Sequence, residues 1–169
     1  MLIRVPAHGL EIRPVGPDEL EAVLEVYREC EDFLALGPVA QASREMVLKD
    51  MDLWRAEGGV YCGVFNAPGE MIGVLDCIPG GYRGDAQTAY LELPMLATPH
   101  RGGGLGAAIV EALEGELRQR GVRTILAGVQ VINPRALKFW RRHGFQVISG
   151  PILHFDGTTA YDLSKELDP

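Results

Sequence analysis

The sequence predicts a single α/β domain with a mixed, mostly antiparallel sheet, and three observations lead to that prediction. A strand, a helix and a second strand follow one another between residues 90 and 131, the order of a βαβ unit. On either side of this unit, apolar runs come in pairs separated by short turn sequences, as in antiparallel hairpins. The 169 residues are 47% hydrophobic, which suits one domain, residues 1–169, with a core of its own.

The N-terminal third is predicted as one strand followed by two helices. Residues 10–15 alternate between apolar and polar and indicate a strand, and residues 16–19 have the proline and acids of a helix start. The first helix is expected to bury Leu20, Val23, Leu24 and Tyr27. Residues 31–42 lack a regular pattern. A second helix is expected from an N-cap at Ser43 to about Glu57, burying Val47, Leu48, Met51 and Trp54.

Two hairpins frame the central unit. Residues 59–66 and 70–78 are predicted strands around the turn 67–69, and a loop follows as far as residue 87. The strand 90–97 contains Pro94, which cannot donate to a sheet ladder and is expected to mark a bulge or a parting of strands. The C-terminal strands 146–155 and 159–163 flank Asp156-Gly157, a second hairpin turn.

The central helix, residues 105–120, begins at a glycine-dense bend that runs from Arg101 to Ala107. One face of this helix is apolar, and Gly121 follows it as a left-handed C-cap. Free N–H groups and the positive end of the helix dipole both point out of a helix N-terminus, and glycines let a ligand approach them closely. The bend is therefore expected to bind phosphate.

Three phosphate-binding patterns compete for this bend. A P-loop is excluded, because no Gly-Lys-Ser/Thr follows the glycines. A dinucleotide-binding fold is formally satisfied by Gly102, Gly104 and Ala107. It requires an acidic residue about twenty residues on, at the end of the next strand, but the chain there has Arg120, Arg123 and the uncharged strand 124–131. The third pattern, Arg/Gln-x-x-Gly-x-Gly/Ala, is met by Arg101, Gly104 and Gly106, and it resembles the pyrophosphate loop of the GNAT superfamily of acetyl-CoA-dependent N-acetyltransferases.

A second motif at the expected distance strengthens this resemblance. Residues 133–145 read NPRALKFWRRHGF and resemble the family's Asn-x-x-Ala-x-x-Phe-Tyr-x-x-x-Gly-Phe segment. The resemblance covers residues 91–145 in sequence and the remainder in element order only. It implies a GNAT-like α/β fold, in which a mixed, mostly antiparallel twisted sheet is flanked by helices. Strands 90–97 and 124–131 of the βαβ unit would splay apart and bind the pantetheine arm of CoA between them.

The resemblance also implies which residues bind acetyl-CoA. Backbone N–H groups near Leu96 and Ala97 would hold the pantetheine amide and polarise the thioester carbonyl, with the register uncertain by one residue. Arg101 would add positive charge at the pyrophosphate, although a solvated loop arginine is the alternative. The cofactor-binding residues implied are Leu96, Ala97, Arg101, Gly102, Gly103, Gly104, Leu105, Gly106, Ala107, Asn133, Ala136 and Phe139. Asn133 also suits the N-cap of the helix that starts at Pro134.

Two residues are candidates for catalysis. Glu92 lies where many family members carry a catalytic glutamate, and it would take a proton from the amine directly or through water. The alternatives are that it faces solvent or pairs with an arginine; Asp76 is a weaker candidate for binding the substrate's charge. Trp140 stands at the family's usual tyrosine, and its indole N–H can donate a hydrogen bond but no proton. Tyr90, Tyr161 or water could replace that tyrosine, or Trp140 could face the core.

Composition limits the partners and the compartment. The formal charge of −7 argues against nucleic acid and mildly favours cationic amines. The histidines and the cysteines Cys30, Cys62 and Cys77 lack metal-type spacing, so no metal is expected, and buried free thiols indicate the cytoplasm. No apolar stretch predicts a membrane span.

The sequence therefore predicts an enzyme that moves an acetyl group from acetyl-CoA to a primary amine of a small molecule or peptide, by direct attack in a ternary complex. The alternative is a catalytically silent acyl-CoA-binding or sensing module of the same fold. The identity of the amine, the use of a longer acyl group, the general acid and homodimerisation are left open by the sequence.

Overall fold

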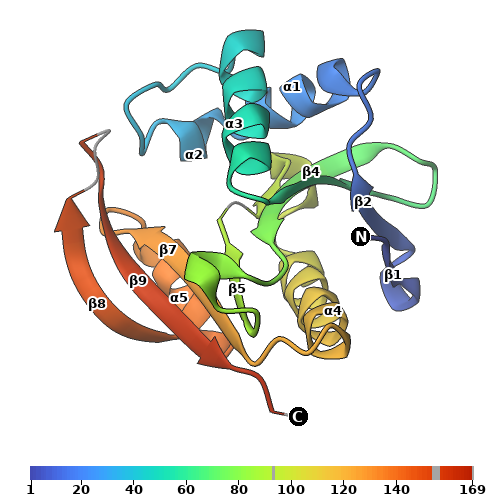
Figure 1. Cartoon of the computed structure of the whole chain (residues 1–169). Coiled ribbons are helices and arrows are strands. Elements are labelled where there is room, and N and C mark those ends of the chain that lie inside the picture. Colours follow the sequence, from blue (N-terminus) through green and yellow to red (C-terminus); the bar gives the residue numbers. More distant parts are fainter. Residues whose placement is uncertain (93, 154–156, 169) are drawn as a thin grey trace.

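A computed structural model describes residues 1–92, 94–153 and 157–168 and has one nine-stranded sheet flanked by helices (Figure 1). The strands run in the order β1-β2-β3-β4-β5-β7-β9-β8, and β6 pairs with β4 beside β5. The strands are β1 (Ile3–Val5), β2 (Leu10–Pro14), β3 (Val60–Phe65), β4 (Met71–Ile78), β5 (Thr88–Leu91), β6 (Met95–Leu96), β7 (Thr124–Gln130), β8 (Gln146–Leu153) and β9 (Thr159–Glu166). The helices are α1 (Leu20–Arg28), α2 (Glu31–Leu34), α3 (Arg44–Ala56), α4 (Leu105–Gln119) and α5 (Pro134–Arg142).

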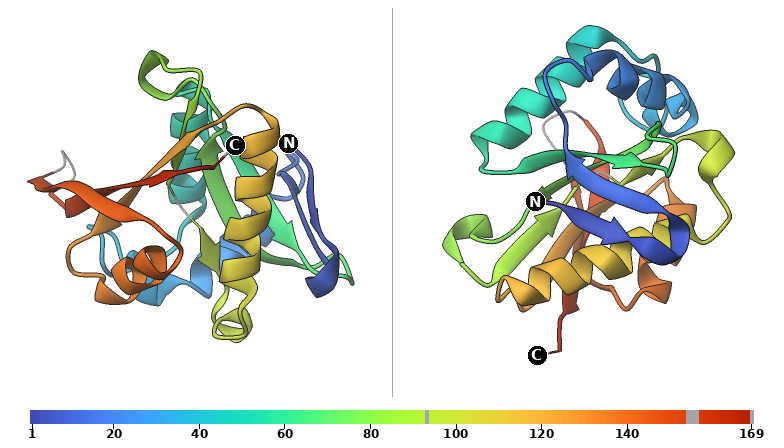
Figure 2. Two further views of the ribbon diagram at one scale, coloured as in Figure 1. Left: turned by 90° about the horizontal axis from the view of Figure 1, so that it is seen from below. Right: turned by 90° about the vertical axis from the view of Figure 1, so that its right-hand side faces the viewer.

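The helices divide between the two faces of the sheet, as Figures 1 and 2 show. Helices α4 and α5 pack on one face, where a large apolar cluster includes Ile109, Leu113 and Leu163. Helices α1 and α3 pack on the other face over a smaller cluster around Tyr27 and Val47. This second face is covered by helices at the β2–β4 end, whereas β7, β9 and β8 carry no helix on that side in the described part of the chain (Figure 1).

The predicted helices form for the reasons the sequence gives. The Ser43 side chain accepts a hydrogen bond from the Met46 N–H at 3.1 Å and caps α3 as expected. Gly121 follows α4 with a φ of 82°, the left-handed conformation predicted for it. The prediction that Leu48 is buried was wrong, because its side chain is 43% exposed on the outer side of α3.

The central strand predicted for residues 90–97 is two strands with different partners. Strand β5 pairs in parallel with β7, from Thr88 opposite Thr124 to Leu91 opposite Ala127. Beyond Leu91 the chain leaves β7, and β6 pairs with β4 instead. The parting of strands expected near Pro94 therefore begins immediately after Leu91, and we call this opening between β6 and β7 the splay.

A one-residue bulge accompanies the splay. Leu91 lies opposite Cys77 and Met95 lies opposite Val74, so four steps along the chain from Leu91 match three steps along β4. An extra residue reverses which face each later side chain meets, because side chains alternate along a strand. Leu91 accordingly belongs to the apolar cluster under α4, and Met95 belongs to the cluster under α1 and α3.

Other differences from the prediction are small. Strand β1 and the short helix α2 were not predicted, because three and four residues give too little periodicity to recognise. Strands β8 and β9 form the predicted C-terminal hairpin; of the turn proposed at Asp156-Gly157, Asp156 lies outside the described residues. Among the described helices, none combines the length and apolar character needed to cross a bilayer.

Candidate active site

The glycine bend has the geometry expected of an anion-binding helix start. Gly102 and Gly104 have φ values of 85° and 83°, and α4 begins directly after Gly104 with no side chain capping it. A Cβ atom added to Gly102, Gly103 or Gly104 would meet no heavy atom within 4 Å. The first-turn N–H groups of α4, which have no acceptor within the helix, thus border open space that a phosphate could fill.

Arg101 is held beside this bend by two protein contacts. Its Nε donates to the Leu96 carbonyl oxygen at 2.7 Å, and its Nη1 lies 2.6 Å from Asp32 Oδ2 on α2. Burial alone would lower the pKa of Arg101, but the hydrogen bond to Asp32 and the contact with Cys30 outweigh it and raise that pKa above its usual value. Arg101 therefore ties the bend to α2 in this structure, a role that neither the phosphate-binding nor the solvated-loop interpretation included.

The two backbone donors expected at the end of β6 are not equivalent. The Ala97 N–H donates to the Ile72 carbonyl oxygen at 2.9 Å and so completes the β4–β6 ladder. Successive N–H groups along a strand point to opposite edges, so the Leu96 N–H points away from β4 and toward the splay. Of the two N–H groups, that of Ala97 is therefore committed to the β4–β6 ladder, and that of Leu96 faces the splay.

The second motif lies at the start of α5. The Asn133 side chain accepts a hydrogen bond from the Ala136 N–H at 3.0 Å, which is the capping role proposed for it. The Phe139 ring lies 3.5 Å from the position of a Cβ on Gly106, in the first turn of α4. The residues of the two motifs therefore meet in space, as the resemblance implied.

Trp140 lies in the core rather than in the splay. Its side chain is 4% exposed and packs edge-on against Phe139 and Phe145, with ring centroids 5.3 Å and 4.8 Å away. The catalytic role considered for Trp140 therefore gives way to packing, the alternative that the sequence had left open. Burying an aromatic ring against two other rings stabilises the fold more than placing the ring in a solvent-filled site would.

Glu92 lies at the first position of the splay, beside Tyr90 of β5. The backbone N–H of Glu92 still donates to the Asp76 carbonyl oxygen at 3.1 Å, so its side chain shares a face with Asp76. A Cβ added to Gly128 of β7 would lie 3.0 Å from the Tyr90 hydroxyl and 4.0 Å from Glu92 Oε2. Burial, the Glu92 charge and a hydrogen bond between the two side chains raise the pKa of Tyr90 above its usual value. Because Gly128 has no side chain, the Tyr90 and Glu92 side chains can occupy the space above it.

Asp76 is the buried neighbour of Glu92. Its side chain is 0% exposed, and neither carboxylate oxygen has a hydrogen-bond partner among the described residues. Burial first, and then the charges of Asp50 and Glu92, raise the pKa of Asp76 to about 9, so the carboxyl group carries a proton at neutral pH. Perturbed carboxyl pairs of this kind are frequent at functional sites.

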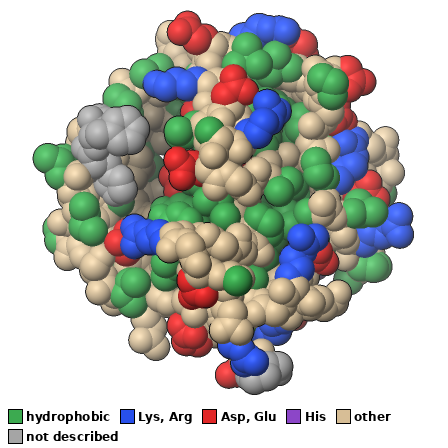
Figure 3. All heavy atoms as spheres, viewed as in Figure 1, with side chains coloured by type: hydrophobic (Ala, Val, Ile, Leu, Met, Phe, Trp, Pro, Cys, Tyr) green, Lys and Arg blue, Asp and Glu red, His purple; other side chains and the backbone are tan. Residues whose placement is uncertain are grey.

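Three aromatic rings border the carboxylates. Tyr90 stacks on Tyr82 with centroids 4.5 Å apart and on Trp54 of α3 with centroids 6.1 Å apart. The space-filling view shows a hollow on this face of the molecule, between the helices and the C-terminal strands, with acidic and hydrophobic side chains at its edge (Figure 3). Glu92 and the three rings therefore suit an acceptor that is both apolar and cationic.

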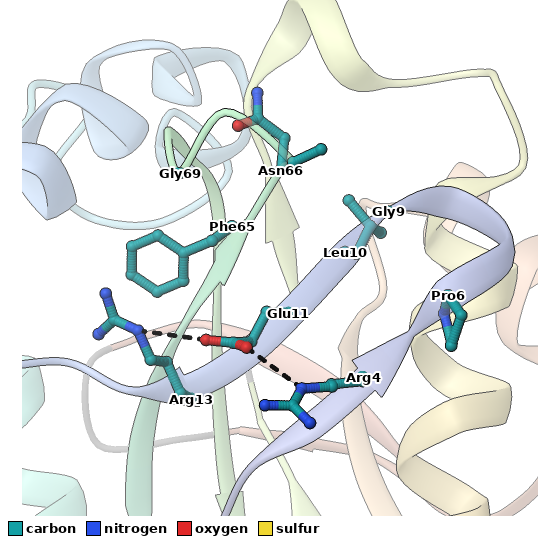
Figure 4. A pocket seen from close by; sticks show the side chains of 10 residues that line it. Arg4, Pro6, Gly9, Leu10, Glu11, Arg13, Phe65, Asn66 and Gly69 are labelled. Carbon is teal, nitrogen blue, oxygen red and sulfur yellow. Dashed lines mark ion pairs between the residues drawn. The ribbon is translucent and has the colours of Figure 1, made fainter.

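A second hollow lies at the other end of the sheet. Residues of β1, β2 and β3 line a shallow pocket of about 400 Å³, in which Glu11 pairs with Arg4 and Arg13 (Figure 4). Its charges are already paired with one another, and it shares no residue with either motif. Within the described part of the chain, no group of three or more His, Cys, Asp or Glu side chains could hold a metal ion.

The comparison with family models decides between the interpretations of the glycine bend. Residues 20–145 match the model described as "Acetyltransferase (GNAT) family". The chain belongs to the acetyltransferase (GNAT) family. The GNAT match spans both motifs, the splay and Glu92, and with it the protein is an N-acetyltransferase rather than a dinucleotide-binding protein.

Solved structures support the GNAT fold over the whole chain. An acetyltransferase from Thermus thermophilus is 26% identical with a TM-score of 0.80, covering 99% of this chain and 100% of its own. A Salmonella typhimurium acetyltransferase that modifies the N-terminal serine of ribosomal protein L7/L12 has 19% identity and a TM-score of 0.76, over 99% and 100% of the two chains. A Vibrio cholerae spermidine N-acetyltransferase, solved with CoA and spermine, has 13% identity and a TM-score of 0.71, over 94% and 96%.

The second and third of these structures are similar in fold alone. Among curated proteins, none matches this sequence.

Sequence reasoning missed two residues near the Tyr90 hydroxyl. Gly128 was predicted only as part of a strand, although a glycine in a strand interior is itself a signal of a close approach. Asp162 lies opposite Gly128 on β9 and was not singled out, because nothing local distinguishes it from any polar strand residue.

Proposed function

We propose that this GNAT enzyme transfers the acetyl group of acetyl-CoA to a primary amine, by direct attack of the amine within a ternary complex. The observation that carries the proposal is the position of Glu92, a carboxylate at the first residue of the splay, between Asp76 of β4 and Gly128 of β7. A base at that point lies beside the opening in the sheet through which family members pass the pantetheine arm, so amine and thioester would meet next to it.

The residues of the donor half, which we define as residues 96–107 with Asn133, Ala136 and Phe139, fit CoA. The uncapped first turn of α4 offers N–H groups to the pyrophosphate, and Gly102, Gly103 and Gly104 leave room for it. The Leu96 N–H points into the splay, where it would hold the pantetheine amide or polarise the thioester carbonyl. Arg101 would keep this half in shape through Asp32 and the Leu96 carbonyl.

Glu92 supplies the base that the reaction requires. A lysine-like amine has a pKa of about 10.4 and arrives protonated, so Glu92 would first remove a proton, directly or through water. The amine nitrogen then attacks the thioester carbon, and a C–N bond forms while the carbonyl oxygen becomes an oxyanion. Collapse of this intermediate breaks the C–S bond and CoA leaves as the thiolate. The nitrogen loses its second proton to water, or to Glu92 once Glu92 has passed the first proton to solvent.

No general acid is needed for this departure. A thiol of cysteine-like pKa, about 8.5, leaves without full protonation near neutral pH. Trp140 is buried and gives no proton, and the Tyr90 hydroxyl bonds with Glu92 and would orient it. The Salmonella and Vibrio proteins act on a protein N-terminus and on spermidine, and this supports an amine as the acceptor.

Thiol release from acetyl-CoA with a panel of amines tests the proposal. We expect Glu92→Gln to lower the rate at neutral pH by about 10²–10⁴-fold, the usual worth of a general base, and to leave CoA affinity unchanged. Glu111→Gln, at an exposed position of α4, is the matched control and should behave as the parent. A pH–rate profile of Glu92→Gln that coincides with the parent's would assign Glu92 to structure and overturn its role as base.

A further inference from the structure

Carboxylates form a row across the sheet on the face that carries the hollow. Asp76 of β4 lies next to Glu92, a Cβ added to Gly128 of β7 would lie 4.0 Å from Glu92 Oε2, and Gly128 pairs with Asp162 of β9. Residues that are opposite one another in neighbouring strands point to the same face. Asp76, Glu92 and Asp162 therefore project to one face of the sheet, with the Tyr90 hydroxyl above Gly128 between the last two.

Asp162 ends this row on the open side of the sheet. Its neighbour Leu163 faces the apolar core under α4 and α5, so Asp162 faces the uncovered side of β7, β9 and β8. The Ser149 hydroxyl of β8 donates to Asp162 Oδ2 at 2.8 Å, which fixes the carboxylate in one orientation. Asp162 is close enough to the Tyr90 hydroxyl to contribute to the raised pKa of Tyr90, after burial and the effects of Glu92 and Tyr82.

Neither carboxylate oxygen of Asp76 has a hydrogen-bond partner in the described part of the chain. This indicates that the row of carboxylates binds a positively charged ligand. A buried carboxylate without hydrogen bonds is costly and is rare unless a ligand or water completes it. The groups that face Asp76 are Tyr61 of β3, Tyr27 of α1, Asp50 of α3 and Glu92, and no lysine or arginine of the described chain contributes to its pKa shift. A cation beside Glu92 would be the first positive charge next to Asp76.

The aromatic rings suit the apolar part of such a ligand. The stack of Trp54, Tyr90 and Tyr82 lies on the same side as the row, and its outer end already carries a cation, because the Arg83 guanidinium lies 5.1 Å from the Tyr82 ring centroid. Ring faces attract ammonium groups and pack against methylene chains. Strands are about 4.8 Å apart, so the positions of Glu92 and Asp162, separated by β7, are about 10 Å apart.

We propose that the acceptor is a diamine or oligoamine whose reacting amine lies at Glu92 while a second, protonated amine binds Asp162, with the methylene spacer along Tyr90. This proposal rests on the acetyl-transfer function above and names its substrate class. The Tyr90 hydroxyl lies above Gly128 of β7, and the spacer would pass over this hydroxyl between the two carboxylates. Asp76, which is protonated in the free enzyme, would ionise beside a cation and so favour a charged amine at the reacting end as well.

Two acceptors that differ only at the far end test this assignment. We expect kcat/KM for 1,4-diaminobutane to exceed that for 4-amino-1-butanol by about tenfold or more, the worth of a hydrogen bond to a charged group. Asp162→Asn should bring the two values together and leave the alcohol unaffected. Asp52→Asn, which removes one negative charge from the exposed side of α3, is the control and should keep the preference. Ser149→Ala, which keeps the charge but removes its hydrogen bond, should weaken the preference.

Each result separates the two proposals. If both amines are acetylated at equal rates, or if Asp162→Asn keeps the preference, the diamine assignment is overturned and acetyl transfer stands. If neither amine is acetylated while another amine of the panel is, the diamine assignment is overturned and acetyl transfer stands. If no amine of the panel is acetylated, acetyl transfer fails, and calorimetric binding of the two compounds to the CoA complex decides the diamine assignment by the same comparison. Binding of the diamine should also release protons at pH 8 in the parent but fewer in Asp76→Asn, because a cation favours the ionised carboxylate.

Discussion

In the function proposed above, the donor half would bind through the backbone, whereas the acceptor half, which comprises Trp54, Asp76, Tyr82, Tyr90, Glu92 and Asp162, would bind through side chains. In the donor half, the N–H groups at the start of α4 and at Leu96 would contact CoA, and the neighbouring glycines have no side chains to block it. In the acceptor half, carboxylates and rings come from α3, β4, β5 and β9. A cosubstrate that is constant can be held by a fixed backbone, and a variable amine needs side chains that evolution can exchange.

This difference explains how much the sequence could predict. The donor half is contiguous, so its glycines, its helix start and Asn133 form motifs that can be read without a structure. The acceptor half depends on register: Asp76, Glu92 and Asp162 come together only through the pairings of β4 with β5, of β5 with β7 and of β7 with β9. Glu92 was predicted because the resemblance places it where many family members carry a catalytic glutamate.

Most of the fold was predictable for the same reason. Hairpins and amphipathic helices are local, and the parting at Pro94 followed from a proline inside a strand. The core position of Trp140 could not be predicted, because its motif aligned it with a tyrosine and only packing against Phe139 and Phe145 reveals its surroundings. The short elements β1 and α2 are stabilised by tertiary contacts, which cannot be recognised from the periodicity of the sequence.

The largest expected effect is a loss of CoA affinity, caused by a substitution that affects the donor half alone. Gly103→Glu places a carboxylate among the first-turn N–H groups of α4, at a glycine that does not need a positive φ and whose Cβ would meet nothing within 4 Å. Losing one or two hydrogen bonds to a charged group, at about 1.5–3 kcal/mol each, predicts CoA affinity reduced by about 10²-fold or more. Calorimetric titration with CoA measures it. Gly103→Ala is the control and should keep the parental affinity. If Gly103→Glu also bound CoA with the parental affinity, the glycine bend would not be part of the CoA site.

Substitutions of Trp140 test whether this residue of the second motif contributes to stability alone and belongs to neither half of the site. We expect Trp140→Ala to cost about 3–5 kcal/mol of unfolding free energy, because it opens a cavity between Phe139 and Phe145. Trp140→Phe and Trp140→Tyr should cost less and should turn over acetyl-CoA equally at matched folded fraction. Denaturant unfolding and thiol release measure both quantities. If Trp140→Tyr turned over acetyl-CoA faster than Trp140→Phe, the residue at position 140 would have a role in catalysis after all.

Asp76 gives the most specific effect, a change with pH that is confined to the acceptor half. Its pKa of about 9 lies above the unfolded value of about 3.9, so the folded protein holds a proton that the unfolded chain has lost. Its contribution to stability is complete below about pH 4 and is lost as pH rises toward 9, by about 1.4 kcal/mol per pH unit. Asp76→Asn should remove this slope, as urea unfolding at a series of pH values would show. An unchanged slope would mean that Asp76 is ionised in the fold.

The bulge between Leu91 and Met95 has a consequence for how such a site could arise. Strand pairing is counted in whole residues, so one inserted residue is the smallest change that detaches a strand from one neighbour while it keeps the other. Without it, β5 and β6 would continue as one strand along β7, Met95 would turn toward α4, and the sheet would close. One inserted residue is thus enough to open the sheet beside Glu92 while β4 stays paired with the chain on both sides of the bulge.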